Sequence, residues 1–203
     1  MSKRIITISR QFGSGGHSIG EKVAEKLGIA FYDSEKLTQK IADETDFDIS
    51  FIRENDEKAY SGMGMFFDLG IHGGTSFTSL SLYDQLYIAQ HNAIREVAEK
   101  EPCVIVGRCA DYVLRNRADL VRIFIKADMP FRIKTIMQRK GLNEEQAKKL
   151  IKEVDKDRSS YYRYYTDQVW GDCEYYDLCI DSSRLGVDGA VKVIKAYIEA
   201  LKK

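Results

Sequence analysis

Residues 5–20 read IITISRQFGSGGHSIG, and the rest of the chain is organised around them. The run from Ile5 to Ile8 is almost wholly apolar and rich in β-branched residues, which is typical of a strand covered on both faces. After a glycine-rich turn, Ile19, Val23 and Leu27 recur every four residues, as on one face of a helix. A strand, a glycine turn and a helix in this order gather backbone N–H groups and a positive helix end at one point, which favours an anion site.

The glycine-rich turn matches part of the phosphate-binding pattern G-x-x-x-x-G-K-[ST]. Gly16 and Ser18 fit it, but His17 stands where the pattern has lysine, and Gln11 stands where it has the first glycine. The turn predicts a site for nucleotide phosphates, with the Ser18 hydroxyl placed to bind Mg²⁺; the alternative is an ordinary tight turn. Because histidine is shorter than lysine and is not a permanent cation, the missing charge must come from elsewhere. The residues expected to bind the phosphates are Gly13, Ser14, Gly15, Gly16, His17 and Ser18.

The composition is that of an ordinary globular protein. Hydrophobic residues make up 44% of the 203 residues, which suits one domain. Lysine plus arginine balances aspartate plus glutamate at 31 each, so the global charge gives no reason to expect nucleic acid or a membrane surface as a partner. No apolar run approaches membrane-spanning length, and the first residues lack the apolar core of a signal peptide, so we expect a cytoplasmic protein.

The cysteines and histidines do not predict a metal centre. The four cysteines form no C-x-x-C pair, and the three histidines are not spaced as zinc ligands. Three of the cysteines have apolar or strand-like neighbours, so we expect buried free thiols in a reducing compartment. The cysteines are Cys103, Cys109, Cys173 and Cys179.

Apolar runs alternate with amphipathic patterns along the whole chain. This alternation predicts right-handed crossovers and a mainly parallel sheet of five strands with helices on both faces, a three-layer α/β domain over residues 1–203. Strands are expected at residues 4–8, 29–32, 103–106, 121–125 and 177–181. Helices are expected from the glycine turn to residue 27 and at residues 35–44, 50–59, 82–100, 128–141, 143–165 and 187–201.

Ligands of parallel sheets bind beyond the carboxyl ends of the strands, and three polar groups are expected there. The glycine turn follows the first strand, Asp33 and Ser34 follow the second, and Arg108 follows the third. Asp33 and Ser34 predict either contacts to an acceptor nucleotide or only a helix N-cap. Arg108 could hold a phosphate through two parallel hydrogen bonds, with Asp111 orienting it or contacting the substrate; the alternative is a surface Arg–Asp pair.

Residues 155–165 are rich in arginine and tyrosine and precede the last predicted strand. Arg158 and Arg163 lie in this segment. Arg132 and Arg139 lie on the helix before it. The arginines together predict a lid that spreads the charge of a transferring phosphoryl group, excludes water and brings the charge that the glycine turn lacks. The alternative is a solvated amphipathic helix whose tyrosines pack on the body.

Residues 60–80 mix glycine, serine and aromatic residues without a helical or strand period. They predict a flexible insertion that encloses the substrate, or else an ordinary surface loop. Phe66, Phe67 and exposed tyrosines would serve a dimer interface equally well, which leaves a homo-oligomer open.

The motifs ISRQFGSGGHSIG (8–20) and GRCADYVL (107–114), with the segment 155–180, resemble the cytidylate-kinase-like family, a branch of the P-loop nucleoside monophosphate kinases. The resemblance implies the adenylate-kinase-like P-loop NTPase fold, with an acceptor-binding region at 33–80 and a helical lid at 129–168. It implies ATP with Mg²⁺ as the phosphoryl donor. As the acceptor it implies a nucleotide substrate, namely a pyrimidine nucleoside monophosphate, CMP or dCMP.

The resemblance also implies roles for the residues at the rim of the sheet. The glycine turn would hold the donor phosphates, and Asp33 and Ser34 would lie on the acceptor side. In the resulting hypothesis, a small-molecule kinase, phosphate charge is neutralised by Arg108, Arg158 and Arg163, and Asp111 or Asp33 orients the acceptor. Two alternatives stay open: a nucleotide-binding sensor with little turnover, for which the absent lysine argues, and a kinase for a different small acceptor.

Overall fold

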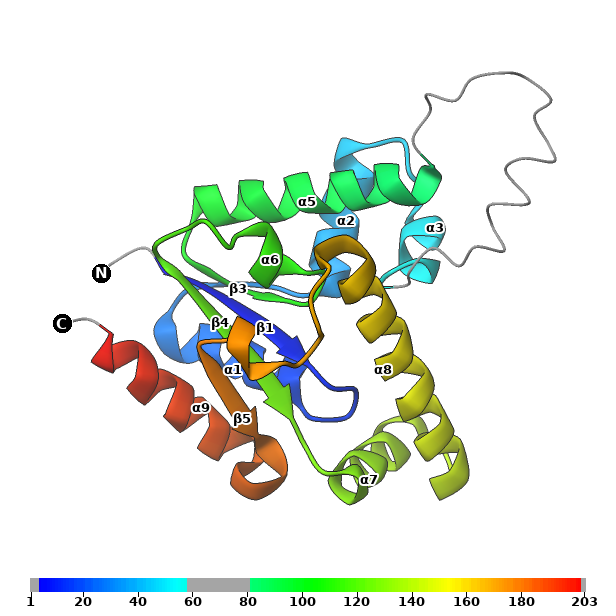
Figure 1. Cartoon of the computed structure of the whole chain (residues 1–203), viewed down its shortest axis with the longest axis vertical. Helices are drawn as coiled ribbons and strands as arrows, with labels where there is room; N and C mark the ends of the chain where they lie inside the picture. Colours follow the sequence, from blue (N-terminus) through cyan, green and yellow to red (C-terminus); the bar gives the residue numbers. More distant parts are fainter. Residues whose placement is uncertain (1–3, 58–80, 202–203) are drawn as a thin grey trace.

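The computed structural model describes residues 4–57 and 81–201. Five parallel strands form one sheet in the order β2-β3-β1-β4-β5 (Figure 1). The predicted parallel sheet of five strands is therefore confirmed. The strands are β1 (Ile5–Arg10), β2 (Ala30–Tyr32), β3 (Cys103–Val106), β4 (Leu120–Lys126) and β5 (Leu178–Asp181).

The helices alternate with the strands along the chain. They are α1 (Gly16–Leu27), α2 (Ser34–Glu44), α3 (Ile49–Glu54), α5 (Leu82–Lys100), α6 (Ala110–Val113), α7 (Met129–Lys140), α8 (Glu144–Thr166) and α9 (Ser182–Ala200), with a 3₁₀ turn at Cys173–Tyr175. Local signals in the sequence fix several helix ends. Asp128 caps α7, Gly141 ends it in a left-handed conformation, and Asn143 with Gln146 forms the predicted capping box of α8.

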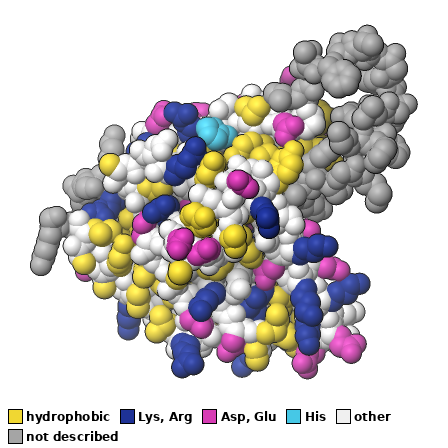
Figure 2. Space-filling view, viewed as in Figure 1, with side chains coloured by type: hydrophobic (Ala, Val, Ile, Leu, Met, Phe, Trp, Pro, Cys, Tyr) yellow, Lys and Arg dark blue, Asp and Glu magenta, His cyan; other side chains and the backbone are white. Residues whose placement is uncertain are grey.

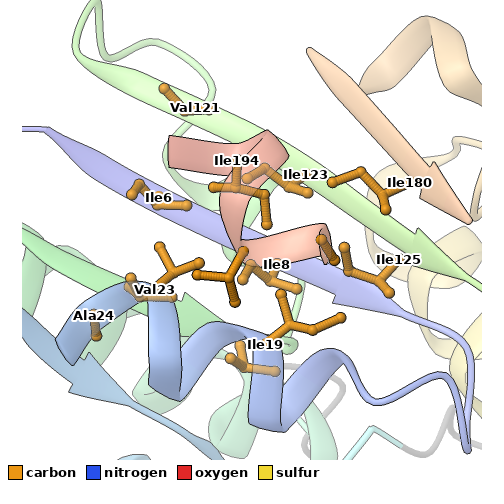
Figure 3. Packing of buried hydrophobic residues seen from close by; sticks show 14 of the residues in the cluster. Ile6, Ile8, Ile19, Val23, Ala24, Val121, Ile123, Ile125, Ile180 and Ile194 are labelled. Carbon is orange, nitrogen blue, oxygen red and sulfur yellow. The ribbon is translucent and has the colours of Figure 1, made fainter. Parts of the chain in front are cut away.

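Strand β1 lies at the centre of the sheet and is buried from Ile5 to Ser9, because β3 and β4 pair with its two edges and helices cover both faces. On one face, Ile6 and Ile8 pack against α1 and α9 (Figure 3). On the other face, Ile5 packs with residues of α2, α5 and α6. Figure 1 shows α5 and α9 on opposite sides of the sheet. The result is the three-layer arrangement that the sequence predicts.

Two predicted helices have different bounds in the structure. The helix expected at 50–59 ends at Glu54, because Asn55 leaves the helical conformation and Asp56 and Glu57 turn toward the sheet. The C-terminal helix begins at Ser182 rather than 187, with a kink at Gly186, whose φ of 63° suits glycine.

The prediction for the cysteines is confirmed in that all four are free thiols, but their expected burial is confirmed only in part. Cys103 and Cys109 are buried free thiols, as expected, but Cys173 and Cys179 are exposed. Cys179 lies on β5, an edge strand, so the strand-like pattern around it did not imply burial. The predicted insertion at residues 60–80, with Phe66 and Phe67, lies outside the described residues.

Candidate active site

The glycine turn presents an open helix end. Gly15 precedes α1 with a φ of 79°, and no side chain caps the helix. The N–H groups of the first turn, from Gly16 to Ser18, therefore remain available for an anion, and the positive end of the helix dipole favours one. Ser18 is exposed on this turn.

The turn is held in shape by hydrogen bonds from both sides. Ser14 is fully buried; its Oγ donates to the Gln11 carbonyl (2.8 Å), and its own carbonyl accepts from Ser182 Oγ (2.6 Å). Gln11, in the place of the first glycine of the pattern, accepts from the Ala127 N–H through its side chain (3.1 Å). Ser14 and Gln11 thus position the backbone of the turn, and the Ser14 hydroxyl is already engaged.

Side chains of helices α7 and α8 form hydrogen bonds with the backbone of the same turn. Arg132 Nε donates to the Phe12 carbonyl (2.8 Å), and Asp155 Oδ1 accepts from the Phe12 N–H (2.8 Å). Arg132 and Asp155 also form an ion pair, and Arg132 is only 4% exposed. Arg132 therefore stabilises the backbone of the glycine turn. Its expected role among the charge-spreading lid arginines is corrected accordingly. Arg139 is exposed on α7.

Gly16→Ala is expected to disrupt the loop. A Cβ at position 16 would lie 2.5 Å from Arg10 Cβ and 2.9 Å from its Cγ, so the Arg10 stem or the loop must move. We expect a loss of about 1–3 kcal/mol in the free energy of unfolding, typical of overpacking, together with weaker ATP binding. Urea unfolding and ATP titration would measure both, with exposed Glu25→Ala on the same helix as the control. Unchanged stability would show that the loop tolerates the extra methyl group.

His17, in the place of the lysine, turns toward the second strand. Its Nε2 lies 2.9 Å from Asp33 Oδ2, and its ring meets Phe31 edge-on. Asp33 caps α2 by accepting from the Lys36 N–H (3.0 Å), which confirms the N-cap interpretation. Burial alone would raise the pKa of Asp33, but the Lys36 N–H and His17 outweigh it and lower that pKa.

Arg108 is buried rather than exposed on the rim, with only 1% of its surface accessible. Its Nε donates to Asp56 Oδ1 (2.6 Å) and its Nη2 to Thr38 Oγ1 (2.7 Å), while Ser34 Oγ donates to the second oxygen of Asp56. The alternative interpretation of Arg108 and Asp111 as a surface pair is wrong, because both side chains are buried. Arg108 Nη1 is buried and makes no hydrogen bond to the part of the chain that the structure describes, residues 4–57 and 81–201.

The buried carboxylate of Glu57 accepts hydrogen bonds from three separate parts of the chain. Arg10 Nη1, at the end of β1, donates to its Oε1 (2.5 Å), and Arg158 Nε, on α8, donates to its Oε2 (2.9 Å). The Arg108 backbone N–H donates to Oε1 as well (3.0 Å). Burial would raise the pKa of Glu57, but Arg10 and Arg158 outweigh it and hold that pKa well below its usual range. We call Arg10, Arg158 and the Arg108 N–H the anion cluster.

The tyrosines of α8 fix the position of Arg158. Tyr161 Oη donates to Gln90 Oε1 (2.6 Å), and Tyr162 Oη donates to Asp111 Oδ2 (2.7 Å). The interpretation that these tyrosines pack on the body is therefore confirmed, and Arg158, one turn earlier, also points inward. Arg163 is exposed on the same helix.

Asp111→Asn is expected to raise stability at neutral pH. Burial raises the pKa of Asp111 above its value in the unfolded chain, so stability falls as pH rises through the range between the two values. Asparagine removes the buried charge and still accepts from Tyr162. We expect the thermal midpoint of the variant to exceed that of the wild type at pH 7 and to match it at pH 3. A lower midpoint at pH 7 would contradict this account.

Figure 2 shows Lys and Arg side chains interspersed with Asp and Glu over α7 and α8, the solvated face of the predicted lid.

Within residues 4–57 and 81–201 no cluster of three or more His, Cys, Asp or Glu could hold a metal ion. Across that same part of the chain, no helix is long and apolar enough to span a membrane.

A hollow of about 620 Å³ lies elsewhere, between α7 and the start of α8. It is lined by Met129, Ile133, Met137 and Lys148 among others, and by no residue of the anion cluster or the glycine turn. Volume alone therefore does not identify the active site.

Sequence reasoning missed Arg10, Asp56 and Glu57. Arg10 carried a signal, because it is a charged residue at the end of the central strand, beside the glycine turn. Asp56 and Glu57 carried no such signal. They follow the short helix α3, and their partners Arg108 and Arg158 are distant in sequence.

The central strand, the glycine turn entering α1 and the arginine-lined rim define a kinase of the P-loop class. The sequence matches the cytidylate kinase-like family over residues 5–184, and the chain belongs to that family. It is a nucleoside monophosphate kinase-like phosphotransferase, and its family implies the use of ATP.

Relatives of similar length are named cytidylate kinase, and solved structures share the fold. The chain is 26% identical to a cytidylate kinase of Methanopyrus kandleri, covering 97% of this chain and 94% of that one, and 28% identical to one of Archaeoglobus fulgidus, covering 97% and 96%. A crystal structure of an uncharacterized protein from Eubacterium ventriosum superposes with a TM-score of 0.74 at 32% identity, covering 97% of this chain and 98% of that one. A shikimate kinase from Acinetobacter baumannii superposes with a TM-score of 0.55 at 15% identity, covering 100% and 97%, and shares the fold.

Proposed function

We propose that the protein transfers a phosphoryl group from ATP to a pyrimidine nucleoside monophosphate, CMP or dCMP. The observation that carries the proposal is the convergence of the anion cluster and the open end of α1 at one rim of the sheet. The curated relatives named cytidylate kinase support CMP as the acceptor.

The glycine turn suits the donor. The first-turn N–H groups of α1, from Gly16 to Ser18, would hold the phosphates of ATP, and Arg132 and Asp155 keep the turn in shape. Mg²⁺ would neutralise charge on the phosphates when bound. Ser18 is the protein group that would hold it, which fits an ion that prefers substrate oxygens and water to a protein cage.

The anion cluster suits the phosphate of the acceptor and the group in transfer. Arg10 and Arg158 bring two permanent cations to the rim, so the charge missing at His17 is available there. Little covalent chemistry is required of these residues, because positioning and charge stabilisation account for most of the catalysis of phosphoryl transfer. Asp33 and Ser34 would lie on the acceptor side of the site. Asp33 is held there by its contact with His17, and Ser34 by its hydrogen bond to Asp56.

One observation favours a second candidate. His17 Nε2 lies 2.9 Å from Asp33 Oδ2, a contact that holds its ring on the second-strand side. A protein whose loop binds nucleotide phosphates but lacks the bridging cation would act as a nucleotide sensor with little turnover.

Coupled ADP release separates the two candidates. The protein with ATP and Mg²⁺ is assayed against a panel of nucleoside monophosphates and nucleosides, beside a melting assay with ATP alone. Turnover with CMP or dCMP well above the rest supports the kinase. Absence of turnover together with stabilisation by ATP, about 2.7 kcal/mol at a hundred times Kd, supports the sensor and contradicts the kinase.

A further inference from the structure

The carboxylate of Glu57 occupies the anion cluster in this structure. It receives three hydrogen bonds, from Arg10, Arg158 and the Arg108 N–H, at 2.5, 2.9 and 3.0 Å. Guanidinium groups and a backbone N–H are the donors that phosphate oxygens take in proteins. Glu57 thus holds the place that an acceptor phosphate would take.

The cluster has no room for a phosphate while Glu57 is present. The space left among the surrounding side chains, which include Ser9, Cys109, Tyr161 and Trp170, is about 10 Å³. That volume admits about one water molecule. A phosphate can take over the hydrogen bonds that Arg10 Nη1 and Arg158 Nε now donate only after the Glu57 carboxylate has left.

The backbone around the carboxylate is strained. Glu57, Arg108 and Cys109 have φ angles of 54°, 55° and 54°, in the left-handed region that non-glycine residues seldom adopt. Such conformations persist where the surrounding interactions hold them, and they are found in switch regions and ligand sites. Here the ion pairs of Glu57 are the interactions that hold its own residue in place.

We propose that Glu57 is a specificity-determining residue, an internal carboxylate that must be displaced by the phosphate monoester dianion of the acceptor. A dianion brings more charge and more acceptor oxygens to the two guanidinium groups than a carboxylate does. A nucleoside or a weakly bound monoanion does not displace the carboxylate, so the site stays closed to it. The inference rests on the proposed function only in taking the displacing ligand to be a phosphate.

The test is calorimetric titration of the full chain with inorganic phosphate. Four proteins are compared: the wild type, Glu57→Gln, Glu57→Gln with Arg10→Met, and Glu54→Gln, which removes an exposed carboxylate three residues away. If Glu57 competes for the site, its removal raises the competent fraction and tightens phosphate binding by about tenfold or more. Glu54→Gln should match the wild type, and adding Arg10→Met should cancel the gain, which a gain at the glycine turn would not show.

Equal or weaker phosphate binding by folded Glu57→Gln would overturn the proposal and leave Glu57 as a structural support. If that variant does not fold, Glu57→Asp decides, because the charge is kept while the carboxylate is drawn back by one methylene. Intermediate tightening is then expected, and unchanged binding overturns the proposal. The titration needs neither ATP nor turnover, so its result is independent of whether CMP proves to be the acceptor.

Discussion

Arg158→Met is expected to lower kcat by about a thousandfold or more, the range seen when an arginine that stabilises the transferring phosphoryl group is lost. Arg158 reaches the rim from α8, where its Nε bonds Glu57 (2.9 Å) and its Nη1 bonds the Arg10 carbonyl (3.1 Å). Its guanidinium thus contacts both the Arg10 carbonyl at the end of the central strand and the Glu57 carboxylate. Methionine keeps the length of the side chain and removes the charge.

The effect should fall on turnover more than on folding, because Glu57 keeps Arg10 as a partner. Lys156→Met, an exposed change on the same helix, is the matched control and should leave kcat unchanged. Steady-state kinetics and a thermal melt on each variant are the measurements. A folded Arg158→Met protein with near-wild-type kcat would remove Arg158 from the mechanism.

Arg108→Met is expected to destabilise the fold by about 3–5 kcal/mol, the loss typical when one partner of a buried ion pair is removed. Arg108 is 1% exposed and donates hydrogen bonds to both Asp56 and Thr38. Without it, the Asp56 carboxylate keeps only the Ser34 hydroxyl among its described partners. The hydrogen bonds that Arg108 forms with Thr38 of α2 and with Asp56 in the turn after α3 would be lost together.

Urea unfolding at pH 7 measures this loss. The control is Arg95→Met, which removes an exposed arginine from α5 and should change stability by less than about 0.5 kcal/mol. A loss below about 1 kcal/mol for Arg108→Met would mean that the Asp56 pair is solvated and that Arg108 remains free to contact substrate, as the sequence suggested.

The sequence predicts the elements well because their signals are local. Apolar β-branched runs mark the strands, and single capping residues such as Asp128, Asn143 and Gly141 mark helix ends within one residue. The glycine turn needs only sixteen consecutive residues to specify its strand–turn–helix context. For these features, no knowledge of distant contacts is required.

The site is harder to predict because its contacts are distant in sequence. Glu57 meets Arg10 across 47 positions and Arg158 across 101. Spacing also misled at Arg108, where Asp111 lies one nominal helical turn away. Arg108 and Cys109 both adopt positive φ, so the chain bends before α6 begins and Asp111 faces Tyr162 instead.

The central claim is that phosphate moves from ATP to CMP at the rim between the glycine turn and the anion cluster. The most direct test is ³¹P NMR of the wild-type protein with ATP, Mg²⁺ and CMP, in which the appearance of ADP and CDP is followed together. The account predicts that the two products rise in a one-to-one ratio. ADP without CDP would mean hydrolysis rather than transfer, and neither product, with ATP bound, would contradict the claim.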